Sequence, residues 1–241
     1  MSDERFLVTG ALGCIGAWVV RHLLRQGAAV AVFDLAARRD QPESLHRLRL
    51  ILEDSELEQV QFIQGDISDL PAVESALQSS RASRIIHLAA LQVPFCKADP
   101  ALGARVNVVG TVNLFEAAKR LGLKRLVYAS SVAVFGRSED YPAGDVPRDA
   151  PLKPRTHYGV YKQANEGTAR IYWQDDGVSS LGLRPYTVYG PGRDQGMTSA
   201  PTKAMLAAAA SRPFHIPFGG RGSSQYVSDV AQLFIEAARV P

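Results

Sequence analysis

Short apolar runs alternate with longer stretches in which apolar residues recur at helical spacing. The short runs are apolar at most positions, which is typical of strands buried on both faces. They lie at residues 6–8, 29–33, 60–63, 84–90, 126–129 and 178–183. Helices are expected at residues 17–25, 41–56, 70–78, 99–121, 158–173 and 202–211, with a last one after residue 230. The alternation predicts a Rossmann-like α/β fold: a doubly wound parallel sheet with right-handed crossovers.

A glycine-rich turn follows the first predicted strand. Gly10, Gly13 and Gly16 recur at three-residue intervals just before a helix. Glycines let the backbone approach a ligand, and the free N–H groups of a helix start attract a pyrophosphate. The second strand ends in Asp34, where a carboxylate can meet ribose hydroxyls and repel a 2′-phosphate. The loop alone could be a plain turn, but with Asp34 it predicts a dinucleotide site that favours NAD over NADP.

A tyrosine and a lysine at the start of a later helix carry candidate chemistry. Tyr158 and Lys162 are four residues apart, so their side chains can share one face. A nearby cation favours the phenolate and lowers the pKa of a phenol towards values at which it accepts an alcohol proton. Ser131 follows the fifth strand, where ligands sit in open α/β sheets. The three predict a catalytic set with Tyr158 as general base; an exposed amphipathic turn is the alternative for the pair alone.

Composition and charge narrow the classes of protein. Hydrophobic residues make up 46% of the 241 residues, and the formal charge is +3 without a long basic run, so nucleic acid is not indicated. Cys14 and Cys96 have no paired spacing and the five histidines are scattered, which indicates neither disulfides nor a metal site and fits a reducing cytoplasm. A charged N-terminus that leads into a strand is no signal peptide, and the most apolar helical run, 204–210, is too short for a membrane span.

Taken in order, the motifs resemble those of extended short-chain dehydrogenase/reductases, the NAD-dependent epimerase/dehydratase family with its UDP-glucose 4-epimerase-like members. The resemblance covers essentially the whole chain. It rests on residues 9–16, Asp34, Asp66, 87–90, Asn107, Ser131, Tyr158, Lys162 and 184–192. Several separate motifs in the family's order make a chance match very rare.

The resemblance implies NAD as the cofactor and a set of residues around it. Those expected to bind the cofactor are Gly10, Gly13, Cys14, Ile15, Gly16, Asp34, Asp66, Ile67, Leu88, Ala89, Ala90, Asn107, Tyr158, Lys162, Tyr186 and Val188. Those expected to bind substrate are Gln92, Ser131, Val132, Tyr158 and Thr187. From sequence alone Asp66 could instead start a turn or cap a helix, and Asn107 could be exposed. His87, which ends a strand, is expected to be structural.

The family also implies a mechanism. Tyr158 as phenolate removes a hydroxyl proton, NAD takes the hydride from the same carbon, and Lys162 lowers the Tyr158 pKa and binds the ribose. In sugar-nucleotide 4-epimerases the keto intermediate turns over and takes the hydride back on its other face. Val132 and Ala133 stand where 4,6-dehydratases carry acidic residues, which disfavours that reaction.

Three functions follow as expectations. The first is an NAD-dependent 4-epimerase of a UDP-hexose type of nucleotide sugar, and the second is a dehydrogenase of a free sugar or sugar acid. The third is a non-catalytic NAD(H)-binding regulator, which an intact catalytic set argues against. Thr187 replaces an Asn that binds diphosphate in many epimerases, and Arg221 is displaced from a related Arg, so both favour the dehydrogenase.

The domain and partner expectations also derive from the family. Residues 1–180 are expected to form the NAD-binding domain, and residues 181–241 a small, shortened substrate-binding region interleaved with the sheet. The partners would be a small-molecule substrate, a UDP-sugar, and a second copy of the chain; neither nucleic acid nor a membrane is expected. The homodimer would form through the helices near Asp99 and Tyr158, although their apolar residues could equally belong to the core.

Overall fold

The structure, a computed structural model, describes residues 4–123, 125–219 and 222–240. In these ranges six parallel strands form one sheet in the order β3-β2-β1-β4-β5-β6. They are β1 (Arg5–Thr9), β2 (Ala29–Asp34), β3 (Gln61–Gln64), β4 (Arg84–His87), β5 (Arg125–Ala129) and β6 (Ser179–Leu183). The strand order reverses between β1 and β4, whose carboxyl ends flank the crevice where such sheets bind ligands. The predicted Rossmann-like fold class is confirmed.

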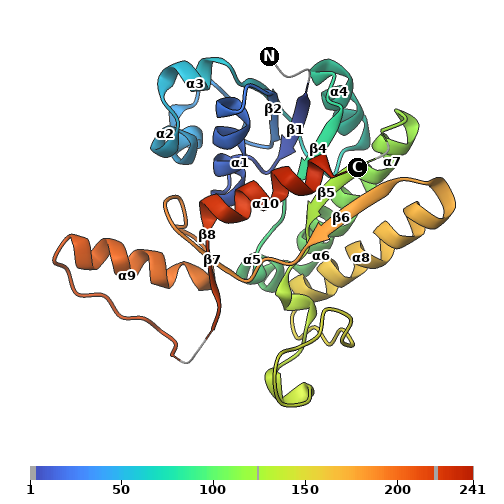
Figure 1. Cartoon of the computed structure of the whole chain (residues 1–241). Helices are drawn as coiled ribbons and strands as arrows, with labels where there is room; N and C mark the ends of the chain where they lie inside the picture. The colour runs from blue at the N-terminus through green and yellow to red at the C-terminus, as the bar shows by residue number, and fades with distance from the viewer. Residues whose placement is uncertain (1–3, 124, 220–221, 241) are drawn as a thin grey trace.

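Helices cover both faces of this sheet (Figure 1). One face carries α1 (Cys14–Arg25), α2 (His46–Ile51) and α10 (Val227–Arg239), and the other α4 (Leu70–Ser80), α7 (Gly110–Arg120) and α8 (His157–Asp176). Successive residues of β1 pack into different layers: Phe6 and Val8 lie in one apolar cluster and Leu7 in the other. This explains why the strand is apolar at every one of these positions.

The chain after β6 forms a smaller part. Strands β7 (Thr187–Tyr189) and β8 (Ser224–Tyr226) pair in parallel as a second sheet, and α9 (Ala200–Ala209) comes between them in sequence. Figure 1 shows α9 extending away from the main sheet, whereas α10 returns to pack against it. Nowhere in the described ranges is a helix long and apolar enough to cross a membrane.

The single helix expected over residues 41–56 is wrong. The segment forms a 3₁₀ turn (Pro42–Leu45), α2, and a separate helix α3 (Asp54–Glu58). Leu52 is extended, with φ −114° and ψ 143°, and Glu53 then caps α3. The Glu53 N–H donates to the Glu56 side chain over 2.9 Å, as part of a capping box. Because these acidic residues satisfy the N–H groups of a new helix start, the chain begins a second helix instead of continuing the first.

No helix was expected between residues 90 and 99, but the structure has one there. Residues Val93–Ala98 form α5, with Pro94 in the first turn, where its missing N–H costs no helical hydrogen bond. Asp99 then caps α6 (Pro100–Ala104), accepting from the Leu102 N–H over 2.9 Å. A π-helical turn (Arg105–Val109) joins α6 to α7.

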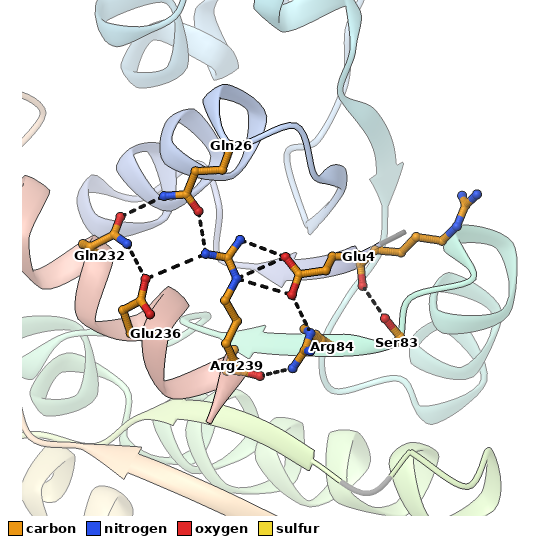
Figure 2. Close-up of polar contacts among 9 residues, drawn as sticks. Glu4, Gln26, Ser83, Arg84, Gln232, Glu236 and Arg239 are labelled. Carbon is orange, nitrogen blue, oxygen red and sulfur yellow. Dashed lines mark hydrogen bonds and ion pairs between the residues drawn. The ribbon is translucent and has the colours of Figure 1, made fainter. Parts of the chain in front are cut away.

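A polar network fastens α10 to the amino ends of the strands (Figure 2). Glu4, just before β1, pairs with Arg239 at 2.9 Å and with Arg84 at 3.1 Å. Arg239 also donates to Gln26, the residue that ends α1, over 2.7 Å. The Arg84 guanidinium donates in turn to the Ala238 carbonyl. The first strand and the last helix of the described chain are thus tied together at the end of the sheet opposite the ligand-binding edge.

Candidate active site

The glycine turn between β1 and α1 is folded tightly against the end of β4. Gly10 has a φ of +67°, and a Cβ on it would lie 2.5 Å from the Ala89 nitrogen. A Cβ on Gly16 would overlap the Gly10 carbonyl oxygen. Gly13 precedes α1 without a side-chain cap, and Cys14 and Ile15 open the helix. The turn therefore brings the backbone N–H groups of a helix start to a cradle suited to a pyrophosphate.

Two predicted cofactor residues lie at the carboxyl ends of neighbouring strands. Asp34 ends β2 and accepts from the Ala36 N–H, while burial raises the pKa of its carboxyl. Asp66, just after β3, accepts from both the N–H and the hydroxyl of Ser68 at 2.8 Å. Asp66 thus starts a turn, as its alternative interpretation proposed, and its role towards a cofactor stays a prediction. Ile67, next to it, is buried in the core.

His87 is buried at the end of β4 between two threonines. Its Nδ1 lies 2.7 Å from the Thr9 hydroxyl and its Nε2 lies 3.1 Å from the Thr111 hydroxyl. Thr111 donates to the Asn107 carbonyl, and Thr9 accepts from the Ala89 N–H. All of these bonds form together only if Nε2 carries the proton and Nδ1 accepts.

The imidazole is held neutral by its surroundings. Burial lowers the pKa of His87 to about 3, and the nearby Lys162 ammonium contributes to this lowering by repulsion. A neutral ring joins the glycine turn, the end of β4 and the π turn without placing a second positive charge beside Lys162. This geometry agrees with the structural role expected for His87.

Asn107 lies in the π turn and is buried, so the exposed alternative is wrong. Its side chain accepts from the Leu91 N–H over 2.7 Å and donates to the Leu91 carbonyl over 3.0 Å. Its backbone carbonyl accepts from Asn165 of α8 over 2.9 Å. Single π turns often mark functional sites, because the widened turn leaves carbonyls available to other partners. Here it connects the segment after β4 with the helix that carries Tyr158 and Lys162.

The three predicted catalytic residues meet beyond the carboxyl end of β5. Ser131 caps a short 3₁₀ turn (Val132–Val134), accepting from the Ala133 N–H, and its hydroxyl is close enough to the Tyr158 phenol to oppose the rise of its pKa. Lys162 is only 2% exposed, and its Nζ lies 5.6 Å from the centre of the Tyr158 ring. The same Nζ donates to the Ala129 carbonyl over 2.6 Å.

The lowering of the Tyr158 pKa that was expected from Lys162 is not found. Burial raises the pKa of the Tyr158 phenol, and the groups that oppose this effect are Ser131 and Arg193. Burial also lowers the pKa of Lys162 to about 8, because its ammonium is enclosed. The cost of burying either charge therefore exceeds what the two side chains gain from each other.

Arg193 is a residue of the site that sequence reasoning did not assign. Its Nη2 donates to Thr198 over 2.7 Å, and its Nε is buried without a partner in the described part of the chain. Its guanidinium lowers the pKa of both Cys14 and Tyr158 against the effect of burial. The positive charge of Arg193 therefore acts on both the start of α1 and the phenol. A glycine-flanked loop after β7 was the available signal, but nothing local indicates its distant partners.

The remaining predicted cofactor and substrate residues range from exposed to buried. Gln92 precedes α5, and its side chain contacts Gly196 in the segment after β7. Tyr186 is exposed, Thr187 is half-buried, and Val188 packs in the core beside α1. Their roles stay predictions, as do those of three residues whose backbone lies beside the turn or the site: Leu88, Ala90 and Val132.

Known proteins share both the sequence pattern and the fold. The sequence profile described as "NAD dependent epimerase/dehydratase family" matches residues 6–241. The chain belongs to this family. A UDP-glucose 4-epimerase of Mycolicibacterium smegmatis is 34% identical, over 97% of this chain and 72% of its own length. A probable UDP-glucuronate 4-epimerase of Rhizobium meliloti is 30% identical, over 98% of this chain and 69% of its own length.

Solved structures agree with the fold. The UDP-glucose 4-epimerase of Thermus thermophilus, in complex with NAD, superposes with a TM-score of 0.81 at 29% identity, over 99% of this chain and 75% of that one. An L-threonine dehydrogenase from Cupriavidus necator reaches 0.84 at 22% identity, over 99% and 73%, and shows the fold alone. Some relatives are much longer: the chain spans 52% of UDP-glucuronate 4-epimerase 5 of Arabidopsis thaliana.

Membership of the family settles the cofactor and the enzyme class. The cofactor is NAD, and the chain is an enzyme of the extended short-chain dehydrogenase/reductase type, as predicted. The glycine turn fits this cofactor. A Cβ at position 10 would overlap the backbone that follows β4, and a Cβ at position 16 would overlap the turn itself, so only glycines allow the turn to fold this tightly. When bound, NAD supplies a reversible hydride acceptor.

Replacing Gly10 should impair NAD binding far more than the same change at a comparable glycine. Gly10→Ala combines a left-handed backbone with overlap onto Ala89, whereas Gly122→Ala has nearly the same φ, +68°, and open space around its Cβ. Both should lose about 1 kcal/mol of stability from the backbone strain. Only Gly10→Ala should also weaken NAD binding, by about tenfold or more. Urea denaturation and calorimetric NAD titration measure both, and equal NAD affinity in the two variants would contradict the role of Gly10.

His87 should make the protein less stable as the pH falls. Its folded pKa of about 3 lies below its ordinary value of 6.5, so the unfolded state binds the proton first and stability is lost below about pH 6.5. From about pH 7 to about pH 5 this group should cost about 2 kcal/mol. His87→Gln keeps a donor and an acceptor but cannot titrate. Between about pH 7 and about pH 5 the free energy of unfolding in urea should therefore fall by about 2 kcal/mol less in this variant than in wild type. If wild type and variant lost the same stability as the pH fell, His87 could not be a buried neutral ring.

Proposed function

We propose that the chain is a 4-epimerase of a nucleotide sugar of the UDP-hexose type. The observation that carries this proposal is the grouping of three side chains beyond β5: Lys162 is buried beside the Tyr158 ring, and the Ser131 hydroxyl is close enough to the phenol to favour its charged form. Curated relatives that are 30–34% identical over nearly the whole chain are UDP-glucose and UDP-glucuronate 4-epimerases. Both supports are consistent with transient oxidation of a sugar hydroxyl at C4.

Each side chain has a distinct part in the proposed reaction. The Tyr158 oxygen takes the proton of the sugar hydroxyl and later returns it, while the Ser131 hydroxyl orients the same oxygen of the substrate. The Ser131 hydroxyl and the Arg193 guanidinium favour the phenolate against the burial that raises the Tyr158 pKa. A hydride leaves C4 and returns to the opposite face of the resulting 4-keto sugar, so the reaction has no net redox change.

A net dehydrogenase of a free sugar or sugar acid is the alternative, because it would use the same three residues. Thr187 favours it, since β7 offers a hydroxyl where many epimerases have an amide for the diphosphate. The second diphosphate residue in question, Arg221, lies outside the described residues. We also propose the predicted division at about residue 180, with the part from residue 181 forming the substrate side.

Replacing Tyr158 by Phe should abolish turnover and leave NAD binding intact. The variant removes the oxygen that exchanges the proton but keeps the ring that fills the buried site. Wild type and variant would be incubated with NAD and a panel of UDP-sugars and free sugar acids, with products followed by NMR and NADH by absorbance. A new 4-epimer without net NADH supports the epimerase, and an oxidised product in step with NADH overturns it. Turnover retained in Tyr158→Phe would remove the phenol from the mechanism.

We further propose a homodimer formed by the helices before and around the site. Tyr161 of α8 donates to the Pro100 carbonyl of α6, which places these helices side by side. Exposed apolar residues lie along both: Leu102 in α6 and Val109 in the π turn that follows it, and Val160 and Ile171 about three turns apart in α8. Apolar faces of this kind are typical of obligate interfaces.

A charge in this surface should separate the subunits. Val160→Glu would bury an unpaired carboxylate between the helices, so the variant should sediment as a monomer where the wild type sediments as a dimer. Leu206→Glu introduces the same charge at an exposed apolar position of α9, away from this surface, and should leave the dimer intact. Wild-type protein that sediments as a monomer at micromolar concentration would overturn the proposal.

A further inference from the structure

The segment 190–194, which follows β7, turns back over the glycine turn. The Trp18 indole N–H of α1 donates to the Pro191 carbonyl over 3.1 Å. A Cβ on Gly192 would lie 3.9 Å from the Cα of Cys14, the first residue of α1. In Figure 1 the loop after β7 reaches back towards α1 and α2. This segment therefore crosses the helix start where the cradle would hold the pyrophosphate of NAD.

An ion pair with α2 fastens the far end of this segment. Asp194 accepts from Arg47 twice, from Nη2 over 2.7 Å and from Nε over 3.1 Å. The remaining arm of Arg47, Nη1, donates to the Leu12 carbonyl within the glycine turn over 3.0 Å. His46 also lies 3.3 Å from the second Asp194 oxygen. A single guanidinium thus holds the glycine turn on one side and the crossing segment on the other.

The burial of Arg47 makes this contact stronger than an ordinary surface pair. Its side chain is 14% exposed, although it carries a full charge, and every arm of its planar group has a partner. Charge-assisted bonds to a shared carboxylate oxygen and a carbonyl are short and orientation-specific. Releasing Asp194 would leave the Arg47 charge partly buried without its counter-ion.

The crossing segment also brings a positive charge inward. Arg193, next to Asp194, carries a guanidinium close enough to Cys14 and Tyr158 to lower the pKa of both, and its buried Nε lacks a partner in the described residues. An unpaired buried donor of this kind is costly unless a ligand satisfies it, and a phosphate is the natural acceptor. The segment is therefore suited to close over an anionic ligand held by the glycine turn.

We propose that Arg47 and Asp194 are positioning residues that fasten segment 190–194 over the bound dinucleotide and retain it between the two half-reactions. This inference rests on the proposed function, because an epimerase must keep its reduced cofactor until the hydride returns. A dehydrogenase, in contrast, must exchange the cofactor in every cycle. The pair makes no contact with the catalytic side chains in the described part of the chain, so it controls release of the cofactor and leaves the proton transfer to Tyr158.

The test measures NAD release, which requires no turnover. Protein loaded with radiolabelled NAD would be mixed with excess unlabelled NAD, and the label that stays bound would be followed in time. Asp194→Asn should raise the dissociation rate about tenfold or more, because it keeps the shape but removes the charge that Arg47 pairs with. Asp40→Asn is the matched control: it removes the same charge from the exposed Arg38–Asp40 pair, also at 2.7 Å, and should leave the rate unchanged. If Asp194→Asn released NAD at the same rate as wild type, the proposal would be overturned.

A second variant guards against misfolding of the first. Arg47→Lys keeps the positive charge but cannot bond Asp194 and Leu12 together, so it should also release NAD faster than wild type. Thermal unfolding would show whether either variant is merely destabilised. Folded variants that both retain NAD as wild type does would again overturn the proposal.

Turnover separates this inference from the proposed function. In Asp194→Asn, some enzyme should release NADH before the hydride returns, so each NADH appears with one molecule of 4-keto sugar and the proton taken from the hydroxyl. The ratio of NADH to 4-epimer should therefore exceed that of wild type and of Asp40→Asn. If wild type makes no 4-epimer, the proposed function fails while the NAD release rates still decide the role of Arg47 and Asp194. An unchanged ratio in an active Asp194→Asn enzyme would contradict retention by this pair.

Discussion

A buried chain of hydrogen bonds through His87 is the constraint on which the rest of the site depends. The ring joins Thr9 at the end of β1 to Thr111 on α7, and Thr111 in turn bonds the carbonyl released by the π turn at Asn107. Asn165 extends the chain to α8, which carries Tyr158 and Lys162. Since buried polar groups are costly when unpaired, the elements can move apart only by breaking several bonds together. The cofactor cradle and the catalytic helix are therefore held in one fixed relation.

Burial gives this site its reactivity and also sets its main energetic problem. The ammonium of Lys162 is buried and the Tyr158 side chain is half-buried, and burial disfavours the charged form of each. A pair of opposite charges so placed needs further polar support, which comes from Ser131 and Arg193 around the phenol and from the Ala129 carbonyl at the lysine. The oxidised nicotinamide carries a positive charge of its own. The proposed phenolate would therefore depend on bound ligands, the positively charged nicotinamide among them, to offset the effect of burial.

The parts of the fold that were predictable from sequence are those with local signals. Strands buried on both faces produce apolar runs such as 29–33, and the glycine turn and the Tyr158–Lys162 spacing are read within a few residues. The break at Leu52 was missed because helical periodicity continues across it, while the capping by Glu53 overrides that pattern. The π turn at Asn107 changes hydrogen bonding without changing composition. Arg193 was missed because its neighbours, Cys14 and Tyr158, are remote in sequence and no periodic pattern connects them.

The choice between epimerase and dehydrogenase depends on groups outside the catalytic set. In both proposed reactions Ser131, Tyr158 and Lys162 would perform the same oxidation, so neither their presence nor their geometry separates the two. What separates them is whether the reduced cofactor can leave before the ketone turns over, and that depends on whatever covers the glycine turn. In this chain the cover is segment 190–194, tied through Asp194 to Arg47 and through Pro191 to Trp18. Because both ties lie beside the glycine turn and not at the catalytic residues, a change at either tie would alter release of the cofactor while leaving Ser131, Tyr158 and Lys162 in place.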